Sequence, residues 1–179
     1  TRMFGELEGF LSANNLTLGA EFLRKLKQAK QHPSRIVAPN GKTPVIGDSS
    51  SPRSGQVKHT WDSFHDAASG FTALKSEECK TYLAFICGFS TVTHKHSDDL
   101  SVLLTYEGKD FFVDSGKYNY GRNKYRRYVV SHKAHSIFSP GRTYQRNSDN
   151  QYSKVIATDH FMDFRGYSLV SGHNFGYKD

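Results

Sequence analysis

The chain has 179 residues, 36% of them hydrophobic and 13% aromatic, and it carries a formal net charge of +7 at pH 7. This length suits one domain, or one full domain with part of a second, and so high an aromatic share excludes a chain that is disordered throughout. No apolar run approaches the roughly 20 residues that cross a bilayer, and two cysteines, Cys79 and Cys87, are too few for a disulfide scaffold or a four-cysteine zinc site.

The positive charge favours an acidic polymer as partner, but charge by itself does not distinguish nucleic acid, an anionic membrane and an acidic polysaccharide. Basic residues cluster at positions 24–27 and 122–127. We interpret the first cluster as a solvated face, whereas the second is either a solvated face or a contact for a polyanion.

The N-terminal part of the chain has a helical pattern. Apolar residues recur at three- and four-residue steps over residues 4–11 and 18–26, which predicts two helices joined at the breaker-rich stretch 12–15. Thr17 stands before the second pattern and Glu21 follows in its first turn, so we expect Thr17 to cap that helix. The apolar stripes are expected to pack in a core.

Residues 32–66 are rich in Pro, Gly and Ser, which predicts a long irregular connector. A segment of this length without secondary structure is unusual inside a compact domain unless it is functional or joins two domains. We therefore expect a boundary between two structural units in this stretch.

From residue 71 onward the pattern changes to that of β-strands, with a hairpin turn at 107–109. Helices followed only by strands indicate an α+β fold or two domains and not a wound βαβ sheet. The predicted strands are 82–87, 100–106, 110–114, 137–138, 155–157 and 167–170.

Histidines carry the first chemical signal. His94 and His96 are separated by one residue, which places both side chains on the same side of an extended chain. Neutral imidazole is the commonest metal ligand and a good base near neutral pH. The alternative is a pair of exposed loop histidines without a chemical role.

Acidic and further histidine residues are expected nearby. Because 100–114 is a predicted hairpin, Asp114 should return to the sheet end that carries Asp98 and Asp99, and His135 precedes another predicted strand. Two imidazoles and one carboxylate suit zinc with an open or water-filled fourth position. Alternatively, Asp114 is a turn carboxylate bonded to its own backbone and His135 is a half-buried histidine with a satisfied ring.

Several stretches resemble the heparinase II/III family of polysaccharide lyases, and together they span nearly the whole chain. The histidine–aspartate segments are the most specific, and the others support them. The stretches are 94–101 (HKHSDDLS), 112–120 (FVDSGKYNY), 127–128 (RY), 134–136 (AHS), 44–48 (PVIGD) and 172–177 (GHNFGY).

The resemblance implies an α+β fold in which the C-terminal helices of an α/α toroid precede part of an antiparallel β-sandwich. Residues 1–48 would then be the end of the toroid domain and its connector. Residues 49–70 would be a linker, and 71–179 the N-terminal part of the sandwich. The remainder of the toroid is an expected partner outside this sequence.

The resemblance also implies roles for individual residues. His94 would lie in the active cleft as a catalytic residue. His96 and Asp114 would bind a zinc ion of mainly structural role, and His135 would complete the site. Ser136 stands where the family usually has Asn, so His160 is held as an alternative to His135.

Members of this family cleave uronic-acid polysaccharides by β-elimination, which implies an acidic polysaccharide as substrate. A base removes a proton beside a carboxylate that has first been neutralised, and a Tyr acts at the leaving oxygen. The family carries that Tyr and a neutralising Asn or His on the toroid, outside this chain. We expect Tyr120, Arg126 and Arg127 to contact the substrate, and a periplasmic or secreted location.

Three other interpretations remain. A cupin-like metal barrel fits Gly88 and the His94–His96 pair, but the expected Glu and the second cupin motif are missing. A non-catalytic sugar-binding sandwich would use Trp61 and exposed tyrosines, although we expect most of these aromatic side chains in the core. No recognised motif supports a nucleic-acid binder, so no nucleic-acid partner is expected.

Overall fold

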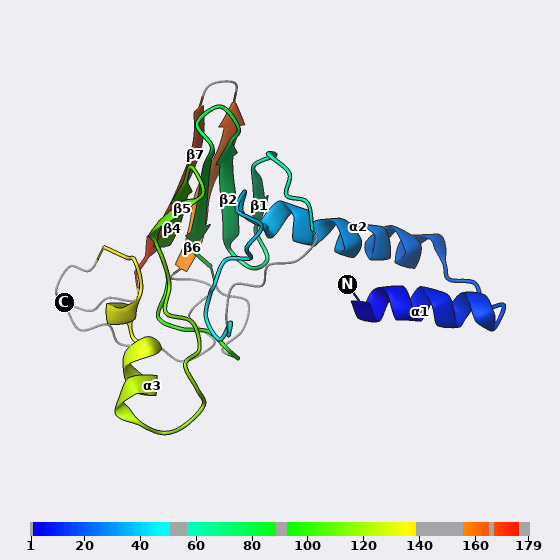
Figure 1. Cartoon of the computed structure of the whole chain (residues 1–179), viewed down its shortest axis with the longest axis horizontal. Helices are drawn as coiled ribbons and strands as arrows, with labels where there is room; N and C mark the ends of the chain where they lie inside the picture. The colour runs from blue at the N-terminus through cyan, green and yellow to red at the C-terminus, as the bar shows by residue number, and fades with distance from the viewer. Residues whose placement is uncertain (1, 51–56, 89–92, 139–155, 165–166, 176–179) are drawn as a thin grey trace.

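The computed structural model describes residues 2–50, 57–88, 93–138, 156–164 and 167–175. Two helices come first, α1 (Arg2–Ala13) and α2 (Ala20–Ile36). They lie side by side (Figure 1), and an ion pair joins Lys30 to Glu8. The helical pattern of the sequence is therefore confirmed, with α2 extending beyond the apolar repeat.

The prediction that Thr17 caps the second helix is wrong. α2 begins at Ala20, and its N-cap is Gly19, which makes no side-chain capping bond. Thr17 lies two residues too early for its hydroxyl to stand at the N-cap position, so backbone geometry alone starts this helix.

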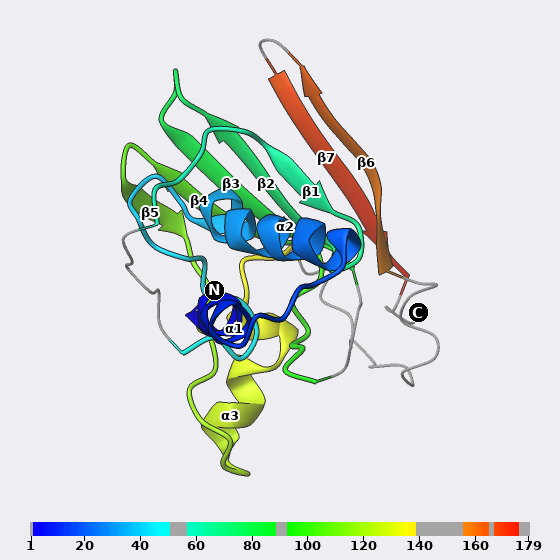
Figure 2. The same ribbon diagram turned by 90° about the vertical axis from the view of Figure 1, so that its right-hand side faces the viewer.

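Within the described residues, seven strands form two antiparallel sheets, so the α+β class is confirmed. The larger sheet has its strands in chain order, and β6–β7 is a separate hairpin beside it (Figure 2). The strands of the larger sheet are β1 (Phe64–Asp66), β2 (Phe71–Ser76), β3 (Thr81–Ile86), β4 (Ser101–Tyr106) and β5 (Lys109–Phe112); the hairpin consists of β6 (Ile156–Phe164) and β7 (Tyr167–Asn174).

Strand β3, in the middle of the larger sheet, has buried side chains on both faces, since successive side chains of a strand point to opposite sides. One face of β3 packs toward the β6–β7 hairpin through Phe85, which contacts Ile156 in a shared cluster. The other face carries Tyr82, Ala84 and Ile86, in a cluster that also takes in the connector after α2. This two-layer packing is that of a β-sandwich.

The connector between α2 and β1 is bonded to the sheet. The Tyr82 hydroxyl donates to the carbonyl of Ile36 at 2.8 Å, and the Lys75 ammonium donates to the carbonyl of Thr60 at 2.8 Å. Burial lowers the pKa of Lys75 to about 8, with a smaller opposing effect from Asp62. These bonds fix the course of the irregular segment and bring its residues 44–50 to one end of the sheet.

Predictions for the C-terminal half were met unevenly. The β4–β5 hairpin turns at Glu107 and Gly108, which both have positive φ, as predicted. Residues 137–138 are not a strand; the neighbouring Ser136 carbonyl instead accepts one bond from Val102. A short helix, α3 (Lys124–Val129), was not predicted. Of the predicted strand 155–157, Val155 lies outside the described residues.

Tyrosine burial also differs from expectation. Among the described residues only Tyr82 is a buried tyrosine; the others lie at strand ends, in loops or on α3. Within the same residues, no helix is both long and apolar enough to cross a membrane. The exposed tyrosines are Tyr106, Tyr118, Tyr120, Tyr125, Tyr128 and Tyr167.

Candidate functional site

Three segments meet at one end of the larger sheet: the connector at 44–50, the loop before β4 and the segment after β5. Glycines allow their backbones to approach. Gly47 has φ 52°, and a Cβ there would lie 2.6 Å from the carbonyl oxygen of His94. Gly116 has φ 63°, and a Cβ there would lie 2.6 Å from the carbonyl oxygen of Ser49. Other residues would clash at both points.

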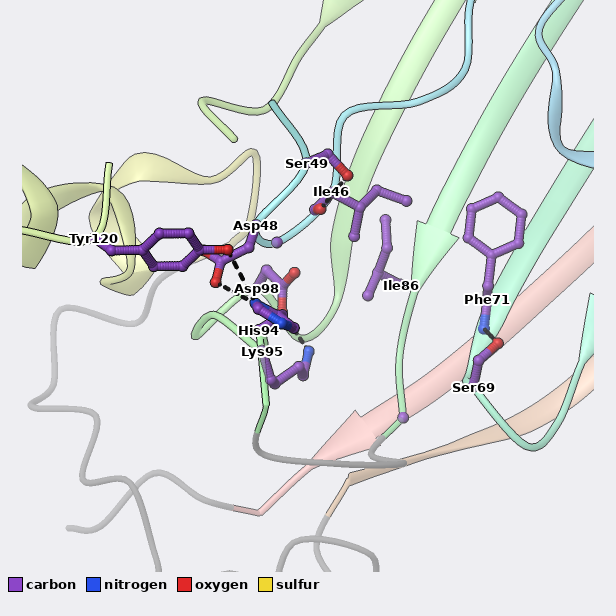
Figure 3. A pocket seen from close by; sticks show the side chains of 12 residues that line it. Ile46, Asp48, Ser49, Ser69, Phe71, Ile86, His94, Lys95, Asp98 and Tyr120 are labelled. Atoms are coloured by element: carbon purple, nitrogen blue, oxygen red, sulfur yellow. Dashed lines mark hydrogen bonds and ion pairs between the residues drawn. The ribbon is translucent and has the colours of Figure 1, made fainter. Parts of the chain in front are cut away.

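Asp48 is the centre of the resulting polar cluster. Its Oδ2 lies 2.8 Å from Nδ1 of His94 (Figure 3), and its Oδ1 lies 2.9 Å from Nε2 of His96. Nη1 of Arg126 lies 2.6 Å from the same Oδ1. One carboxylate therefore joins both histidines of the His94–His96 pair to a basic residue of α3.

The charge of Asp48 is strongly stabilised. Burial of its carboxylate, only 5% of whose side chain is exposed, opposes ionisation, but hydrogen bonds from Arg126, His96 and His94 outweigh this cost. The pKa of Asp48 therefore lies well below its usual value. An ionised carboxylate accepts hydrogen bonds only, which constrains the protons of its partners.

His94 and His96 point in different directions, contrary to the same-side expectation. His94 has φ 64°, so the chain turns there and is not extended. Its side chain is 61% exposed, whereas that of His96 is fully buried. His94 faces a pocket of about 450 Å³ that Asp48, Lys95 and Tyr120 also line. A non-glycine residue at positive φ is uncommon and concentrates at functional sites.

His96, His135 and Asp114 lie together behind this pocket. The rings of His96 and His135 are 5.4 Å apart between centroids, and Nδ1 of His135 lies 2.5 Å from Oδ2 of Asp114. The other Asp114 oxygen accepts from the backbone of Gly116 at 2.9 Å. Among the described residues, Nδ1 of His96 and Nε2 of His135 are buried without a hydrogen-bond partner.

These atoms decide how well the cluster fits a metal. Two unpartnered, buried ring nitrogens on neighbouring histidines are the donors that zinc prefers. Yet the described side chains contain no group of three His, Cys, Asp or Glu already spaced to hold an ion. Asp114 makes contact with His135 itself, as a carboxylate that orients a metal-binding ring also does. The described residues would therefore give a zinc ion two histidine ligands, His96 and His135, with the carboxylate of Asp114 beside them.

Lys95 and its acidic neighbours fix the loop that carries both histidines. The buried ammonium of Lys95 forms ion pairs with Asp98 and, at 2.8 Å, with Asp99. Burial opposes the charge of Lys95, but the two carboxylates overcome it and raise the pKa of Lys95. Asp98 and Asp99, which lie at the sheet end where the histidines were expected, thus act as ion-pair partners of Lys95.

The expected substrate-contacting residues differ in exposure. Tyr120 is exposed, and its hydroxyl lies 3.2 Å from Nδ1 of His94. Arg127 is exposed on α3. Arg126 faces inward, where it also donates to the carbonyl of Lys117 at 2.8 Å and lies against the Tyr120 ring. Arg126 is thus a link between α3 and Asp48.

Two further assignments follow from the geometry. His135 rather than His160 contacts Asp114, since His160 lies exposed on β6. Asp48 was missed as a site residue because its partners are 46 and 48 positions away in the sequence. The only sequence feature that pointed to Asp48 was its place at the end of the stretch 44–48, which resembles the family.

Comparison with known proteins gives the family. The family model of the heparinase II/III-like C-terminal domain matches residues 58–178, more than half of the chain. A search of curated proteins found no match. The match confirms the resemblance found in the sequence and sets the cupin-like interpretation aside.

Solved structures agree with this fold. A heparinase III with methylated lysines has a TM-score of 0.76 and 16% identity, over 99% of this chain and 32% of its own. A second heparinase III has a TM-score of 0.73 and 18% identity, over 97% and 34%. The heparan sulfate lyase HepC from Pedobacter heparinus has a TM-score of 0.72 and 16% identity, over 97% and 32%.

The chain thus spans about a third of the length of these structures, and at such identities the likeness concerns the fold. It includes the helices as well as the sheets, since nearly all of the chain is aligned. On the evidence of the family match, the chain belongs to the heparinase II/III-like family.

Proposed function

We propose that this protein is part of a polysaccharide lyase that cleaves an acidic, uronic-acid-containing polysaccharide by β-elimination. The observation that carries the proposal is the exposed His94 in its pocket, backed by the buried Asp48. A histidine held by a carboxylate on one ring nitrogen and open on the other side is a suitable proton acceptor or relay. Family membership supports the reaction class.

The proposed reaction removes the proton on the sugar carbon next to the carboxylate. The electrons of that C–H bond form a C=C double bond, the glycosidic C–O bond at the neighbouring carbon breaks, and the departing oxygen takes up a proton. His94 accepts or relays a proton, or positions the sugar carboxylate. The Tyr and the Asn or His that complete the chemistry are expected on the remainder of the toroid, outside this chain.

The proposed substrate contacts are Tyr120 and Arg127, and Arg126, which was also expected to contact the substrate, supports the site indirectly. The exposed ring of Tyr120 lies beside His94 and is flanked by the Lys117 ammonium at 5.0 Å. Arg127 is exposed on α3 and places its positive charge at the surface, while Arg126 lies behind the pocket and holds Asp48. The net charge of +7 adds attraction for an acidic polymer, which salt would screen.

A zinc ion is the proposed cofactor, held by His96, His135 and Asp114. The two buried ring nitrogens without partners support it, and Asp114 is the nearest carboxylate. The metal would supply a structural crosslink between the loop before β4 and the segment after β5. It would thereby steady the loop that carries His94.

We also propose that the protein acts in the periplasm or outside the cell, where it would meet polysaccharide. The exposed apolar side chains of α1 and α2, such as Phe10 and Leu23, support a place for the remaining toroid helices against them. The expected partners are therefore the substrate and the rest of the toroid.

The test is lyase activity of the protein with its complete toroid on several acidic polysaccharides, followed by the ultraviolet absorbance of the unsaturated uronate product. His94→Ala should remove most turnover while the fold is retained. His160→Ala, which removes an exposed histidine from β6, should leave turnover unchanged. Full activity of His94→Ala on the best substrate would refute the role of His94, and absence of any product with the unaltered protein would refute the lyase proposal.

A further inference from the structure

The remaining question about the site is which ring nitrogen of each histidine carries the proton. His94 and His96 both contact Asp48, but through different nitrogens: Nδ1 in His94 and Nε2 in His96. A neutral imidazole has one N–H donor and one lone pair, so fixing one nitrogen fixes the other. The contacts of Asp48 therefore determine which ring nitrogen of each histidine keeps a lone pair, and so which one can accept a proton or bind a metal.

The contacts of Nε2 assign the proton of His96. Nε2 lies 2.9 Å from Oδ1 of Asp48, and an ionised carboxylate can only accept a hydrogen bond. Nη1 of Arg126, which donates to the carbonyl of Lys117 at 2.8 Å, lies farther from Nε2, at 3.3 Å. The shorter contact makes Nε2 of His96 the donor to Asp48, which leaves the lone pair on Nδ1.

The same reasoning applies to His94. Its Nδ1 lies 2.8 Å from Oδ2 of Asp48, an oxygen that can only accept while the carboxylate is ionised. Nδ1 therefore carries the hydrogen, and the Tyr120 hydroxyl at 3.2 Å stands beside it as a second, longer contact. The lone pair is left on Nε2, to which the described residues offer no hydrogen bond, in a side chain that is 61% exposed.

We infer that Asp48 is a positioning residue that sets the tautomers of both histidines, so that His94 presents Nε2 to the substrate pocket and His96 keeps a buried lone pair on Nδ1, its ring beside that of His135. One buried carboxylate would thus prepare the proton acceptor and the proposed metal-binding nitrogen together. Arg126 completes the arrangement because it neutralises the carboxylate and ties it to α3. The kinetic part of this inference rests on the proposed lyase function, and the tautomers themselves do not.

The direct test is the nitrogen-15 NMR spectrum of the histidine rings in the protein at a pH where they are neutral. The expected result is an Nδ1–H tautomer for His94 and an Nε2–H tautomer for His96, with signals assigned by their loss in His94→Gln and His96→Gln. The opposite tautomer at His94 would overturn the inference whether or not the protein turns over a polysaccharide.

The kinetic test uses Asp48→Asn, whose amide can donate to Nδ1 of His94 and so reverse its tautomer. We expect kcat to fall roughly 10²- to 10³-fold while KM changes by no more than about threefold. Asp159→Asn is the matched control, since it alters another Asp–His pair, 2.6 Å from His173 on the β6–β7 hairpin. An unchanged kcat in Asp48→Asn would overturn the inference, and if that variant does not fold, the tautomers of the unaltered protein decide.

If the unaltered protein shows no turnover on any polysaccharide tested, the proposed function fails, and the ring tautomers still support or overturn the role of Asp48. The two failures are therefore distinguishable.

Discussion

At the scale of single residues, the site depends on positions where the backbone has no room for a side chain. Gly47 brings the connector against the His94 carbonyl, and it directly precedes Asp48. The amide of Asp48 also donates to that His94 carbonyl at 3.3 Å. The carboxylate reaches both histidines only because this approach is possible.

Gly47→Ala should therefore destabilise the protein by about 2–3 kcal/mol. The alanine would have to adopt a positive φ, and its Cβ would clash with the backbone carbonyl of His94, which cannot move aside as a side chain can. The measurement is urea denaturation. Gly41→Ala is the control: it has a similar φ of 77° but nothing within 4 Å of its Cβ, so it should cost only about 1 kcal/mol. Equal losses in the two variants would contradict the steric explanation.

At the scale of elements, the sequence predicted what depends on local pattern. The β4–β5 hairpin follows from two apolar runs around Gly108, and the α1 and α2 helices follow from their apolar repeat. Asp48 could not be found this way because its role arises from contacts between segments far apart in the chain. His94 and His96 were found, but their divergent directions depend on a local φ that the pattern His-x-His does not encode.

The short helix α3 escaped prediction because it has six residues and no buried side chain, so it lacks an apolar period. Its sequence signal is the N-cap. The Asn123 side chain accepts from the amides of Tyr125 and Arg126 at 3.0 and 2.9 Å. The capped helix delivers Arg126 to Asp48, so α3 contributes to the site through its capping as well as its charge.

Asn123→Ala should remove this cap and cost about 1 kcal/mol of local stability. The expected result is faster amide hydrogen exchange at Tyr125 and Arg126, with little change in the β3 amides. Asn123→Asp, which retains an acceptor oxygen, should behave like the unaltered protein. Unchanged exchange in Asn123→Ala would mean that contacts of Arg126 alone hold α3 in place.

At the scale of the whole molecule, distant segments are held together by polar contacts as well as by the apolar core. The proposed zinc would be one such link, joining the loop before β4 to the segment after β5. The buried Lys75 is another, since it joins β2 to the carbonyls of Val37 and Thr60 in the connector. Each has a consequence for stability that can be measured.

Removal of the proposed zinc should lower the melting temperature, because a ligand that binds only the folded state stabilises it. The measurement is thermal unfolding before and after dialysis against a chelator, with metal content determined by elemental analysis. In His135→Ala, which lacks a proposed ligand, chelation should have no further effect. Protein that contains no zinc and unfolds at the same temperature with and without chelator would contradict the proposal.

Lys75 makes stability depend on pH in a way that its burial dictates. Its pKa is about 8 in the folded protein and has the ordinary lysine value of 10.5 when the chain is unfolded. Between these values the unfolded chain binds more protons, so the free energy of unfolding rises with pH. Below pH 8 the folded state bears the full cost of the buried charge, about 3 kcal/mol. Burial also raises the pKa of Cys87 to about 11, which opposes this trend above pH 9.

From pH 7 to 9 the effect of Lys75 outweighs that of Cys87, and the free energy of unfolding should rise there by about 1 kcal/mol. Denaturation in urea at several pH values measures it. Lys75→Met should abolish the rise, because the group that titrates is gone, whereas Lys109→Met, which removes an exposed lysine from β5, should preserve it. A rise that persists in Lys75→Met would assign the pH dependence to another group. A flat profile in the unaltered protein would mean that water reaches the ammonium and keeps its pKa near the unfolded value.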